Sequence, residues 1–364
     1  MTETTIGFIG LGLIGGSIAR GLKRADKNIT IMAYMRTRSK LEQAQKEGIV
    51  DVILEGIDET LAQCDIIFLC TPVEYNAAYL KKIRPFLKPG AILTDVGSTK
   101  TNIHKTVIEM GMEDVFIGGH PMAGSEKTGY ENSTDHLLEN AYYIISPTAK
   151  NKPEQIERMR QIALALRAIP LVLHYEEHDF SVAAISHLPH LIASSLVKLV
   201  KDNDSENQTM KRIAAGGFKD ITRIASSSPV MWEQICMTNT DNLKILMRRY
   251  IESLEHIYDD LDAHNGPAIY GLFDESGKYR DTFSSIKRGP VAPNHSFSVD
   301  VVDEPGSIAI LSAILASRGI NVKNIGINNA RDYGEGALRI EFYSEEKKLE
   351  AAKLLNHYNY TLTR

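Results

Sequence analysis

The first 175 residues alternate short apolar runs with segments whose apolar residues recur at helical spacing. The runs expected to form strands are Thr5–Ile9, Ile29–Ala33, Ile66–Cys70, Ile92–Asp95, Val115–Gly118 and Tyr142–Ile145. The helical pattern is clear at Leu41–Glu47 and at Tyr75–Phe86. Strands that alternate with helices are typical of βαβ units, which build a parallel sheet. We therefore expect an α/β domain over residues 1–175.

The pattern changes over residues 176–286, where strand-like alternation nearly disappears. Three stretches there follow a helical period: Asp179–Asp202, Glu206–Ile224 and Pro229–Asp262. This pattern predicts an all-α domain. The stretch Met231–Leu261 is long and amphipathic, and helices of this kind often pack against a second copy. We expect this domain to form a homodimer.

The last part of the chain is predicted to be a separate small domain. Residues 287–294 are rich in Gly and Pro and are expected to be a linker. Residues 295–364 then predict strand Phe297–Val302, helix Gly306–Arg318, strands Asn321–Asn328 and Ala337–Tyr343, helix Glu345–Asn356 and strand Tyr360–Thr363. This β-α-β-β-α-β order is the ferredoxin-like one.

A glycine-rich turn follows the first predicted strand and opens the first helix: Gly10, Leu11, Gly12, Leu13, Ile14 and Gly15. In a G-x-G-x-x-G turn, the glycines permit a tight turn, a close approach to a pyrophosphate and close helix–strand packing. The N–H groups of the helix then face the phosphates. Because the turn lies within a βαβ pattern, we expect a Rossmann domain that binds a dinucleotide, rather than a turn that only packs.

The end of the second strand bears on the choice of dinucleotide. NAD sites usually have an acidic residue there, which binds the ribose 2′-hydroxyl. This chain has Met35, followed by Arg36 and Arg38. Arginine near this position can accommodate the 2′-phosphate of NADP. Alternatively both arginines are solvated charges, with Arg36 stacked on the adenine. The sequence therefore predicts NAD or NADP without deciding between them.

Composition and charge exclude several other classes of protein. The formal net charge of −5 and the pI near 6.1 give no support for a nucleic-acid partner. Cys64, Cys70 and Cys236 follow no C-x-x-C spacing, so neither a disulfide framework nor a zinc site is expected. The acidic cluster Asp259–Asp262 includes no histidine at a suitable offset for a metal.

Membrane insertion is not expected either. The apolar run Ile6–Leu22 is broken by glycines, and no segment has the roughly 18 uninterrupted apolar residues of a membrane span. We expect a cytoplasmic protein without metal, nucleic-acid or membrane partners.

Three further segments carry polar residues where chemistry is expected. Thr94–Lys100 and Gly118–Glu126 each follow a predicted strand, and ligands of open α/β sheets bind at the carboxyl ends of strands. His120 is therefore well placed for chemistry near a nicotinamide ring. The third segment is Ser186–His190, within a helical pattern, followed by Phe218–Arg223.

With these motifs in this order, the whole chain resembles the prephenate dehydrogenase family. The motifs are Gly10-x-Gly12-x-x-Gly15, Asp95-Val-Gly-Ser-Thr-Lys100, His120-Pro-Met-Ala-Gly124, Ser186-His-Leu-Pro-His190, Gly217-Phe-Lys-Asp-Ile-Thr-Arg223 and Trp232. The resemblance implies oxidative decarboxylation of prephenate to 4-hydroxyphenylpyruvate in tyrosine biosynthesis. Hydride would pass from C4 to NAD(P)+, and the ring carboxylate would leave as carbon dioxide. Met35 departs from the family pattern.

The resemblance also implies roles for individual residues. His120 would accept the hydroxyl proton, and imidazole can be neutral at working pH. Ser98 would hydrogen-bond His120 or the substrate hydroxyl, although a serine before a helix also fits a cap. Arg223 would clamp a carboxylate through a bidentate pair. The alternative for Arg223 is an ion pair with Asp220 on the same helix face.

Further site residues follow from the same resemblance. Those expected at the substrate are His190, Ser125 and Glu126, and those expected at the coenzyme besides the glycine turn are Arg36, Thr71 and Pro72. For His187 and Trp232 we favour packing roles over substrate contact.

The last domain resembles an ACT domain, a small regulatory module that binds amino acids. The matching segments are Asp303–Gly306 and Gly319–Asn324. L-Tyrosine, the end product, is the ligand this implies, as an inhibitor. The residues expected at its site are Asp303, Pro305, Gly306, Asn321 and Asn324. The alternative is a domain that only supports dimerisation.

Other functions also fit parts of the pattern. The same fold could act on arogenate, whose side chain carries an amine in place of the keto group. A β-hydroxyacid dehydrogenase also pairs a Rossmann domain with a helical one, but it leaves the last domain unexplained. A non-catalytic amino-acid sensor would be expected to have lost the glycine turn or His120, and both are present.

Overall fold

The computed structural model describes residues 4–124, 127–285, 295–302, 304–330 and 335–363. The chain divides into two compact units, Met1–Leu272 and Phe273–Arg364. The first unit contains a large sheet with flanking helices and most of a helical domain. Among the described residues, the second contains the end of the helical domain and a small sheet with two helices on it.

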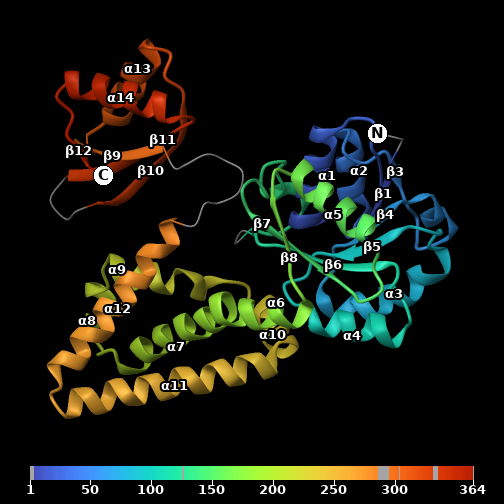
Figure 1. The fold of residues 1–364 in the computed structure, drawn as a ribbon, viewed down its shortest axis with the longest axis horizontal. Coiled ribbons are helices and arrows are strands. Elements are labelled where there is room, and N and C mark those ends of the chain that lie inside the picture. Colours follow the sequence, from blue (N-terminus) through green and yellow to red (C-terminus); the bar gives the residue numbers. More distant parts are fainter. Residues whose placement is uncertain (1–3, 125–126, 286–294, 303, 331–334, 364) are drawn as a thin grey trace. The chain divides into compact units, whose positions relative to one another are not determined.

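The sheet of the first unit has the strand order β3-β2-β1-β4-β5-β6-β7-β8 (Figure 1). Its strands are β1 (Thr5–Ile9), β2 (Thr30–Tyr34), β3 (Val52–Ile53), β4 (Ile66–Leu69), β5 (Ile92–Asp95), β6 (Phe116–Pro121), β7 (Tyr142–Pro147) and β8 (Ile169–Val172). The order reverses direction between β1 and β4, and open α/β sheets bind ligands in the crevice at such a point. The glycine turn therefore lies at the expected coenzyme crevice.

Two strands, β7 and β8, run opposite to the other strands of this sheet. β7 is antiparallel to β6, because the described residues between them form a short 3-10 turn (Tyr130–Asn132) and no crossover helix. β3 and β8 were not among the predicted strands. β3 has two residues, and β8 contains Pro170 and is partly exposed, so neither shows a buried apolar run.

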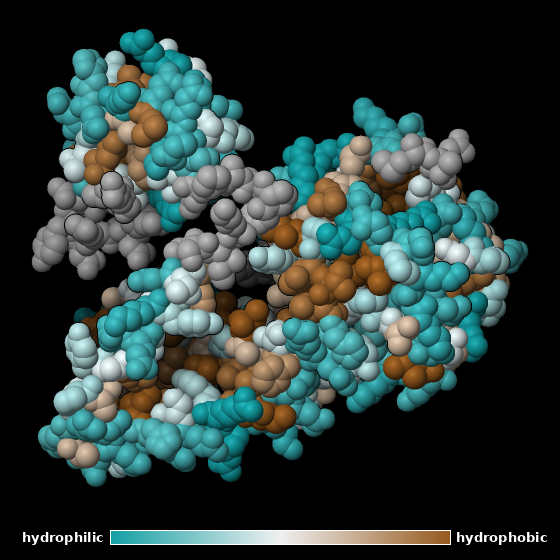
Figure 2. All heavy atoms as spheres, viewed as in Figure 1, coloured by the Kyte–Doolittle hydropathy of each residue, from teal (hydrophilic) through white to brown (hydrophobic). Residues whose placement is uncertain are grey.

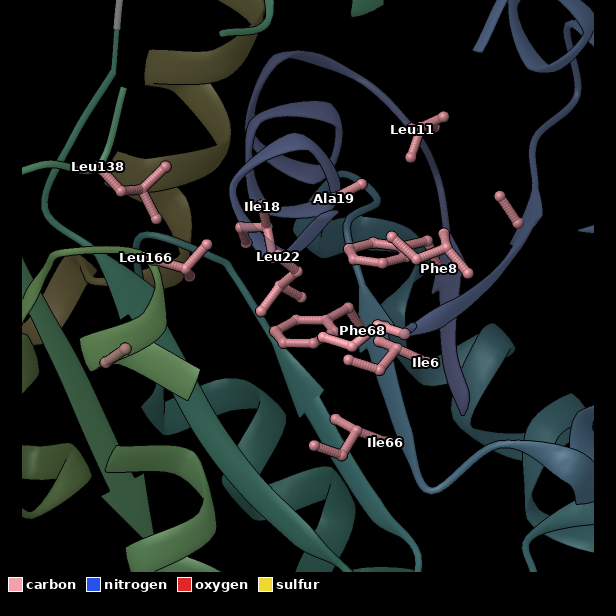
Figure 3. Packing of buried hydrophobic residues seen from close by; sticks show 14 of the residues in the cluster. Ile6, Phe8, Leu11, Ile18, Ala19, Leu22, Ile66, Phe68, Leu138 and Leu166 are labelled. Atoms are coloured by element: carbon pink, nitrogen blue, oxygen red, sulfur yellow. The ribbon is translucent and has the colours of Figure 1, made fainter. Parts of the chain in front are cut away.

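Both faces of the sheet are buried, as the apolar strands predict. The flanking helices are α1 (Leu13–Ala25), α2 (Arg38–Lys46), α3 (Asn76–Ile83), α4 (Thr101–Glu109) and α5 (Pro153–Ala165). Alternate strand residues pack on opposite sides. Phe8 and Phe68, whose ring centroids are 5.1 Å apart, face α1 and α5 (Figure 3), whereas Ile9 and Leu69 face α3 and α4.

The helical domain follows the sheet. Its elements are α6 (Tyr175–Val182), the π-helical turn η5 (Ala183–His187), α7 (Leu188–Asn203), α8 (Thr209–Ile213), α9 (Gly216–Thr222), the 3-10 turn η6 (Arg223–Ser226), α10 (Pro229–Thr238), α11 (Thr240–Asp262) and α12 (Gly266–Ser285). The π turn ends two residues before Pro189. Proline donates no backbone hydrogen bond, and its ring clashes with the carbonyl four residues earlier, so the regular helix cannot continue unchanged.

Two predicted helices are interrupted in the structure. The helix predicted over Glu206–Ile224 is split into α8, α9 and η6, with Gln208 in the left-handed region at φ 52°. The helix predicted over Pro229–Asp262 breaks at Asn239, between α10 and α11. α12 was not predicted, and its glycines explain why its helical pattern is weak.

One helical stretch of the described residues, Tyr175–Asn203, is long and apolar enough to cross a membrane by length and composition. It contains three buried polar residues, His178, Asp179 and His187, and packs against α4 and α11. A helix in the core of a folded domain passes the same test; 28% of the apolar window of this stretch is buried.

The second unit has four antiparallel strands in the order β10-β11-β9-β12. Its elements are β9 (His295–Val302), α13 (Ser307–Ser317), β10 (Val322–Ala330), β11 (Glu335–Phe342), α14 (Glu345–His357) and β12 (Leu362–Thr363). Both helices cover one face of this sheet (Figure 1), where Val299, Leu311, Ile340 and Leu355 form the core. The predicted β-α-β-β-α-β order is confirmed.

Candidate active site

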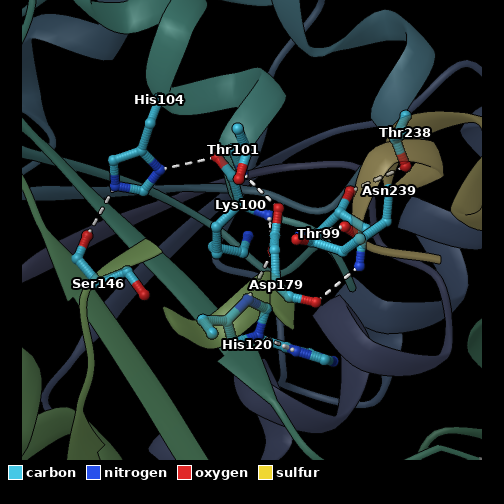
Figure 4. A network of polar contacts seen from close by, with 12 residues as sticks. Thr99, Lys100, Thr101, His104, His120, Ser146, Asp179, Thr238 and Asn239 are labelled. Atoms are coloured by element: carbon cyan, nitrogen blue, oxygen red, sulfur yellow. Dashed lines mark hydrogen bonds and ion pairs between the residues drawn. The ribbon is translucent and has the colours of Figure 1, made fainter. Parts of the chain in front are cut away.

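A chain of hydrogen-bonded side chains joins the end of β6 to α6 (Figure 4). Nδ1 of His120 lies 2.8 Å from Nε2 of His178, and Nδ1 of His178 lies 2.8 Å from Oδ1 of Asp179. The carboxylate of Asp179 can only accept, so His178 donates from Nδ1 and accepts at Nε2. His120 then donates from Nδ1. This assignment leaves the lone pair of His120 on Nε2, ready to accept a proton.

The carboxylate of Asp179 is held by the start of helix α4, which belongs to the sheet domain. Its carboxylate accepts hydrogen bonds from the backbone N–H groups of Lys100 (2.7 Å) and Thr101 (2.8 Å), at the start of α4. Burial opposes ionisation, but the hydrogen bonds from His178, Thr101 and Lys100 outweigh it and lower the pKa of Asp179. Asp179 is therefore a carboxylate that caps α4 and orients His178.

A buried ion pair lies beside this chain. The Lys100 ammonium is paired with the Asp95 carboxylate at the end of β5, and both side chains are fully buried. Asp95 also accepts hydrogen bonds from the backbone N–H of Gly97 (2.9 Å) and of Gly119 (3.2 Å). The carboxyl end of β5 is thereby tied to the residue that precedes His120.

The surroundings of His120 keep its imidazole neutral. Burial, followed by repulsion from His178, Lys100 and His187, lowers the pKa of His120 well below its ordinary value of 6.5. A neutral imidazole with a free Nε2 is a proton acceptor.

The helical domain contributes an aromatic wall. The rings of His190 and Trp232 stack with centroids 3.6 Å apart, and His187 meets Trp232 edge-on at 5.9 Å. Burial lowers the pKa of His190, Arg223 lowers it further by repulsion, and a hydrogen bond to the Ser186 carbonyl opposes both. The structure therefore brings three predicted residues, His190, Trp232 and Arg223, to one region.

His187 has a packing role, as expected. It is buried, and its Nδ1 lies 3.2 Å from Nδ2 of Asn239, which also donates to the Asp179 carbonyl at 2.7 Å. Burial lowers the pKa of His187 to about 4. Nε1 of Trp232 is buried and has no hydrogen-bond partner among the described residues.

The glycine turn has the geometry that a dinucleotide requires. Gly10 has φ +94°, and a Cβ there would lie 2.6 Å from the backbone oxygen of Cys70, so only glycine fits. At Gly12, which precedes α1, no described atom lies within 4 Å of a Cβ position, and no side chain caps the helix. The N–H groups of this helix end are open to a pyrophosphate. Leu11 is buried in the core beneath them.

The two arginines after β2 differ in their surroundings. Arg38 is exposed and paired with two carboxylates, Glu42 (3.0 Å) and Glu55 (2.6 Å). The guanidinium of Arg36 lies 5.8 Å from the ring centroid of Tyr75. Both arginines are exposed. Arg38 differs in that two carboxylates pair with it, as the surface-charge alternative predicts.

The other predicted coenzyme residues follow β4. The hydroxyl of Thr71 donates to Oδ1 of Asn76 at 3.1 Å, and Pro72 precedes the turn η2 (Val73–Tyr75). Both lie at the carboxyl edge of the sheet beside the glycine turn, because β4 neighbours β1.

Ser98 lies in the bend after β5. Among the described residues its side chain makes no hydrogen bond with His120, whose Nδ1 is taken by His178. Ser125, Glu126 and Asp303 lie outside the described residues. Of the predicted regulatory residues, Gly306 has φ +99° just before α13, and Pro305, Asn321 and Asn324 are exposed.

His178, Asp179 and Asn239 were not among the residues predicted at the site. The signal for the first two was a His-Asp pair at the start of an otherwise apolar helical stretch, since buried polar side chains need partners. Asn239 gave no comparable signal, because its role depends on the break between α10 and α11.

Comparison with known proteins identifies the family. A family model described as prephenate dehydrogenase, nucleotide-binding domain, matches residues 18–169, and one described as prephenate dehydrogenase, dimerization domain, matches residues 174–275. Prephenate dehydrogenase of Bacillus subtilis is 33% identical over 355 residues, which cover 97% of this chain and 96% of that protein. The chain belongs to the prephenate dehydrogenase family. It is a nicotinamide-dependent oxidoreductase.

Solved structures of this family have the same fold as the first unit. Prephenate dehydrogenase of Aquifex aeolicus, in complex with hydroxyphenyl propionate and NAD+, is 28% identical with a TM-score of 0.73, covering 78% of this chain and 99% of that one. Arogenate dehydrogenase of Synechocystis is 30% identical with a TM-score of 0.71, covering 77% of this chain and 100% of that one.

Proposed function

We propose that this prephenate dehydrogenase family member oxidises prephenate to 4-hydroxyphenylpyruvate and carbon dioxide. The observation that carries the proposal is the chain His120–His178–Asp179, which presents a neutral imidazole at the carboxyl edge of a dinucleotide-binding sheet. The names of the B. subtilis and A. aeolicus relatives support the same substrate.

His120 is the base of this reaction. Its Nε2 accepts the proton of the C4 hydroxyl while the C4 hydrogen leaves as hydride, so that a C4 carbonyl forms. The nicotinamide, when bound, supplies the hydride acceptor. Breaking the bond to the ring carboxylate then releases carbon dioxide and leaves its electron pair in the ring, which becomes aromatic. His120 returns its proton to the product oxygen, and no net proton is released.

The two carboxylates of prephenate require cationic or donor groups. We propose that Arg223 binds one of them, because a guanidinium forms a bidentate, charge-assisted pair. His190, held against Trp232, offers a second polar contact on the same side. We also propose Ser98, Ser125 and Glu126 as substrate contacts, and this part of the proposal is supported only by the resemblance of their motifs to the family.

Residues Gly10–Gly15, with Thr71, Pro72 and Arg36, would hold the coenzyme. Met35 removes the acid that normally selects NAD, and Arg36 has no carboxylate partner among the described residues. We therefore propose that the protein accepts both NAD and NADP.

The test is the reduction of NAD and of NADP, in separate assays, by the purified protein with prephenate. Release of 4-hydroxyphenylpyruvate supports the proposal, and His120→Asn should reduce turnover by about 10²- to 10⁴-fold without loss of fold. Arogenate is the second candidate, because the similar Synechocystis enzyme is named for it. Oxidation of arogenate alone would replace prephenate as the substrate.

We further propose a cytoplasmic homodimer formed through the helical domain, residues 176–286. Apolar side chains gather on this domain in Figure 2. Exposed examples include Met237 on α10 and Leu254 and Tyr258 on α11. An apolar patch of this kind marks a protein interface, and the matching family model is that of a dimerization domain.

Residues 295–364 are proposed to be an ACT domain that binds L-tyrosine and inhibits the enzyme. The observed β-α-β-β-α-β order and the segments Asp303–Gly306 and Gly319–Asn324 support this. The residues 1–175, 176–286 and 295–364 would then be the coenzyme, substrate and regulatory domains, with a linker at 287–294.

A further inference from the structure

Two buried charges beside His120 have no part in the proton transfer itself. Lys100 and Asp95 are fully inaccessible and paired with each other. Burial of an ion pair removes the hydration of both charges, and such a pair is often no more stabilising than apolar residues of the same volume. Stability alone therefore gives little reason for this pair.

The pair is connected to the backbone that carries His120. Asp95 accepts a hydrogen bond from Gly119, the residue before His120, at 3.2 Å, and from Gly97 at 2.9 Å. The backbone of Lys100 is fixed as well, because its N–H donates to Oδ1 of Asp179 at 2.7 Å. The same carboxylate accepts from His178, so both charges are attached to the chain that orients His120.

The charges around His120 come from three elements. His178 faces it from α6, His187 from the π turn, and Lys100 from the segment before α4. Asp95 lies behind Lys100 as its partner, on β5. Lys100 is the one permanent cation among these described groups, and its repulsion is one of the causes that lower the pKa of His120, after burial and His178.

We propose that Asp95 and Lys100 act as a positioning pair for the proposed reaction. Asp95 holds the backbone of Gly119, and thereby His120, against β5. Lys100 provides a buried positive charge that keeps His120 unprotonated before the substrate binds. The same charge favours return of the proton from His120 to the product oxygen. This inference rests on the proposed function, in which His120 is the base.

The test compares pH profiles of kcat/KM for prephenate in the wild type, Lys100→Met and Asp95→Asn, at saturating coenzyme. Lys100→Met leaves an unpaired carboxylate that favours the imidazolium, so activity should be lost at a higher pH, by about one unit. Asp95→Asn keeps an oxygen that can accept the hydrogen bond from Gly119, but it leaves the Lys100 ammonium unpaired. The unpaired charge disfavours the imidazolium, so activity should be lost at a lower pH than in the wild type. Two opposite shifts are expected.

A matched control is Lys23→Met, which removes the ammonium of another ion pair in the same domain, Lys23–Asp51 at 2.7 Å. This variant should not change the acid limb, that is, the pH at which kcat/KM falls on the acidic side of the profile. Binding of the coenzyme, followed by fluorescence, shows which variants are folded. If Lys100→Met does not fold, Asp95→Asn decides alone, and an unmoved acid limb overturns the inference.

Failure of the inference is distinct from failure of the proposed function. A wild type that oxidises no prephenate with either coenzyme overturns the function. A wild type that is active, with folded variants whose acid limbs do not move or move in the same direction, overturns only the role of Asp95 and Lys100.

Discussion

Nδ1 of His120 lies 2.8 Å from Nε2 of His178, although the two residues are 58 positions apart and belong to different domains. The tautomer of the proposed base is therefore set by the helical domain. Through Asp179, that same domain also caps a helix of the coenzyme domain. The site exists only when the two domains are correctly joined.

His178→Phe should lower kcat by about 10- to 100-fold, because phenylalanine fills the space but cannot accept the hydrogen bond that orients His120. The KM for the coenzyme should stay unchanged. Steady-state kinetics with prephenate measure both values. His174→Gln, at an exposed histidine just before α6, is the control and should behave like the wild type. Equal effects of the two substitutions would argue against the orienting role.

Stability should fall as the pH drops from about 6.5 to about 4. The pKa of His187 is lowered from 6.5 to about 4 in the folded state, so the unfolded state binds more protons across this window. The free energy of unfolding therefore rises with pH there, and His187 contributes up to about 3 kcal/mol of this dependence. Urea titrations at several pH values measure it.

His187→Leu should flatten that dependence, because the group that titrates is gone. His136→Gln, at an exposed histidine, should leave the slope as it is. An unchanged slope in His187→Leu would show that this histidine is not the source.

Arg36→Gln should raise the KM for NADP by about tenfold and the KM for NAD much less, because only NADP carries a 2′-phosphate. Arg38→Gln should change neither value, since Arg38 is already paired with Glu42 and Glu55. Initial rates with each coenzyme at saturating prephenate provide the test. A larger rise in the KM for NADP in Arg38→Gln than in Arg36→Gln would show that Arg38, not Arg36, binds the 2′-phosphate.

Asn324→Ala should weaken inhibition by L-tyrosine while kcat without tyrosine stays the same. Asn324 is exposed near the start of β10, on the second unit. Inhibition curves in the full-length protein measure the change. Asn356→Ala, on α14, is the control. Unchanged inhibition in Asn324→Ala would place tyrosine elsewhere, for instance in competition at the active site.

Local sequence patterns predict much of the fold. Six strands of the large sheet were predicted from apolar runs. The order of elements in residues 295–364 was predicted from the change between strand-like and helix-like spacing of apolar residues. The errors have local causes too. β3 has two residues and leaves little pattern, and the break at Asn239 lies inside an amphipathic stretch whose period continues across it.

The site was only partly predictable. The glycine turn and the segment around His120 are contiguous, so their chemistry could be inferred from neighbouring residues. The partners of His120 could not, because a hydrogen bond between residues 58 positions apart depends on how α6 packs on the sheet domain. The pairing of Arg38 with Glu55 was likewise not predictable, because it joins residues 17 positions apart.

Local sequence patterns are enough to predict a dinucleotide-binding sheet, a helical domain and a small α/β module in this order, with a histidine at the edge of the sheet. The spacing of apolar residues and the conformational needs of glycine involve only a few neighbouring residues, so they can be recognised without the fold. The free nitrogen of His120, the lowered pKa of Asp179 and the burial of Lys100 beside Asp95 become visible only in the folded chain. Protonation and charge depend on burial and on distant partners, and these arise when the domains pack.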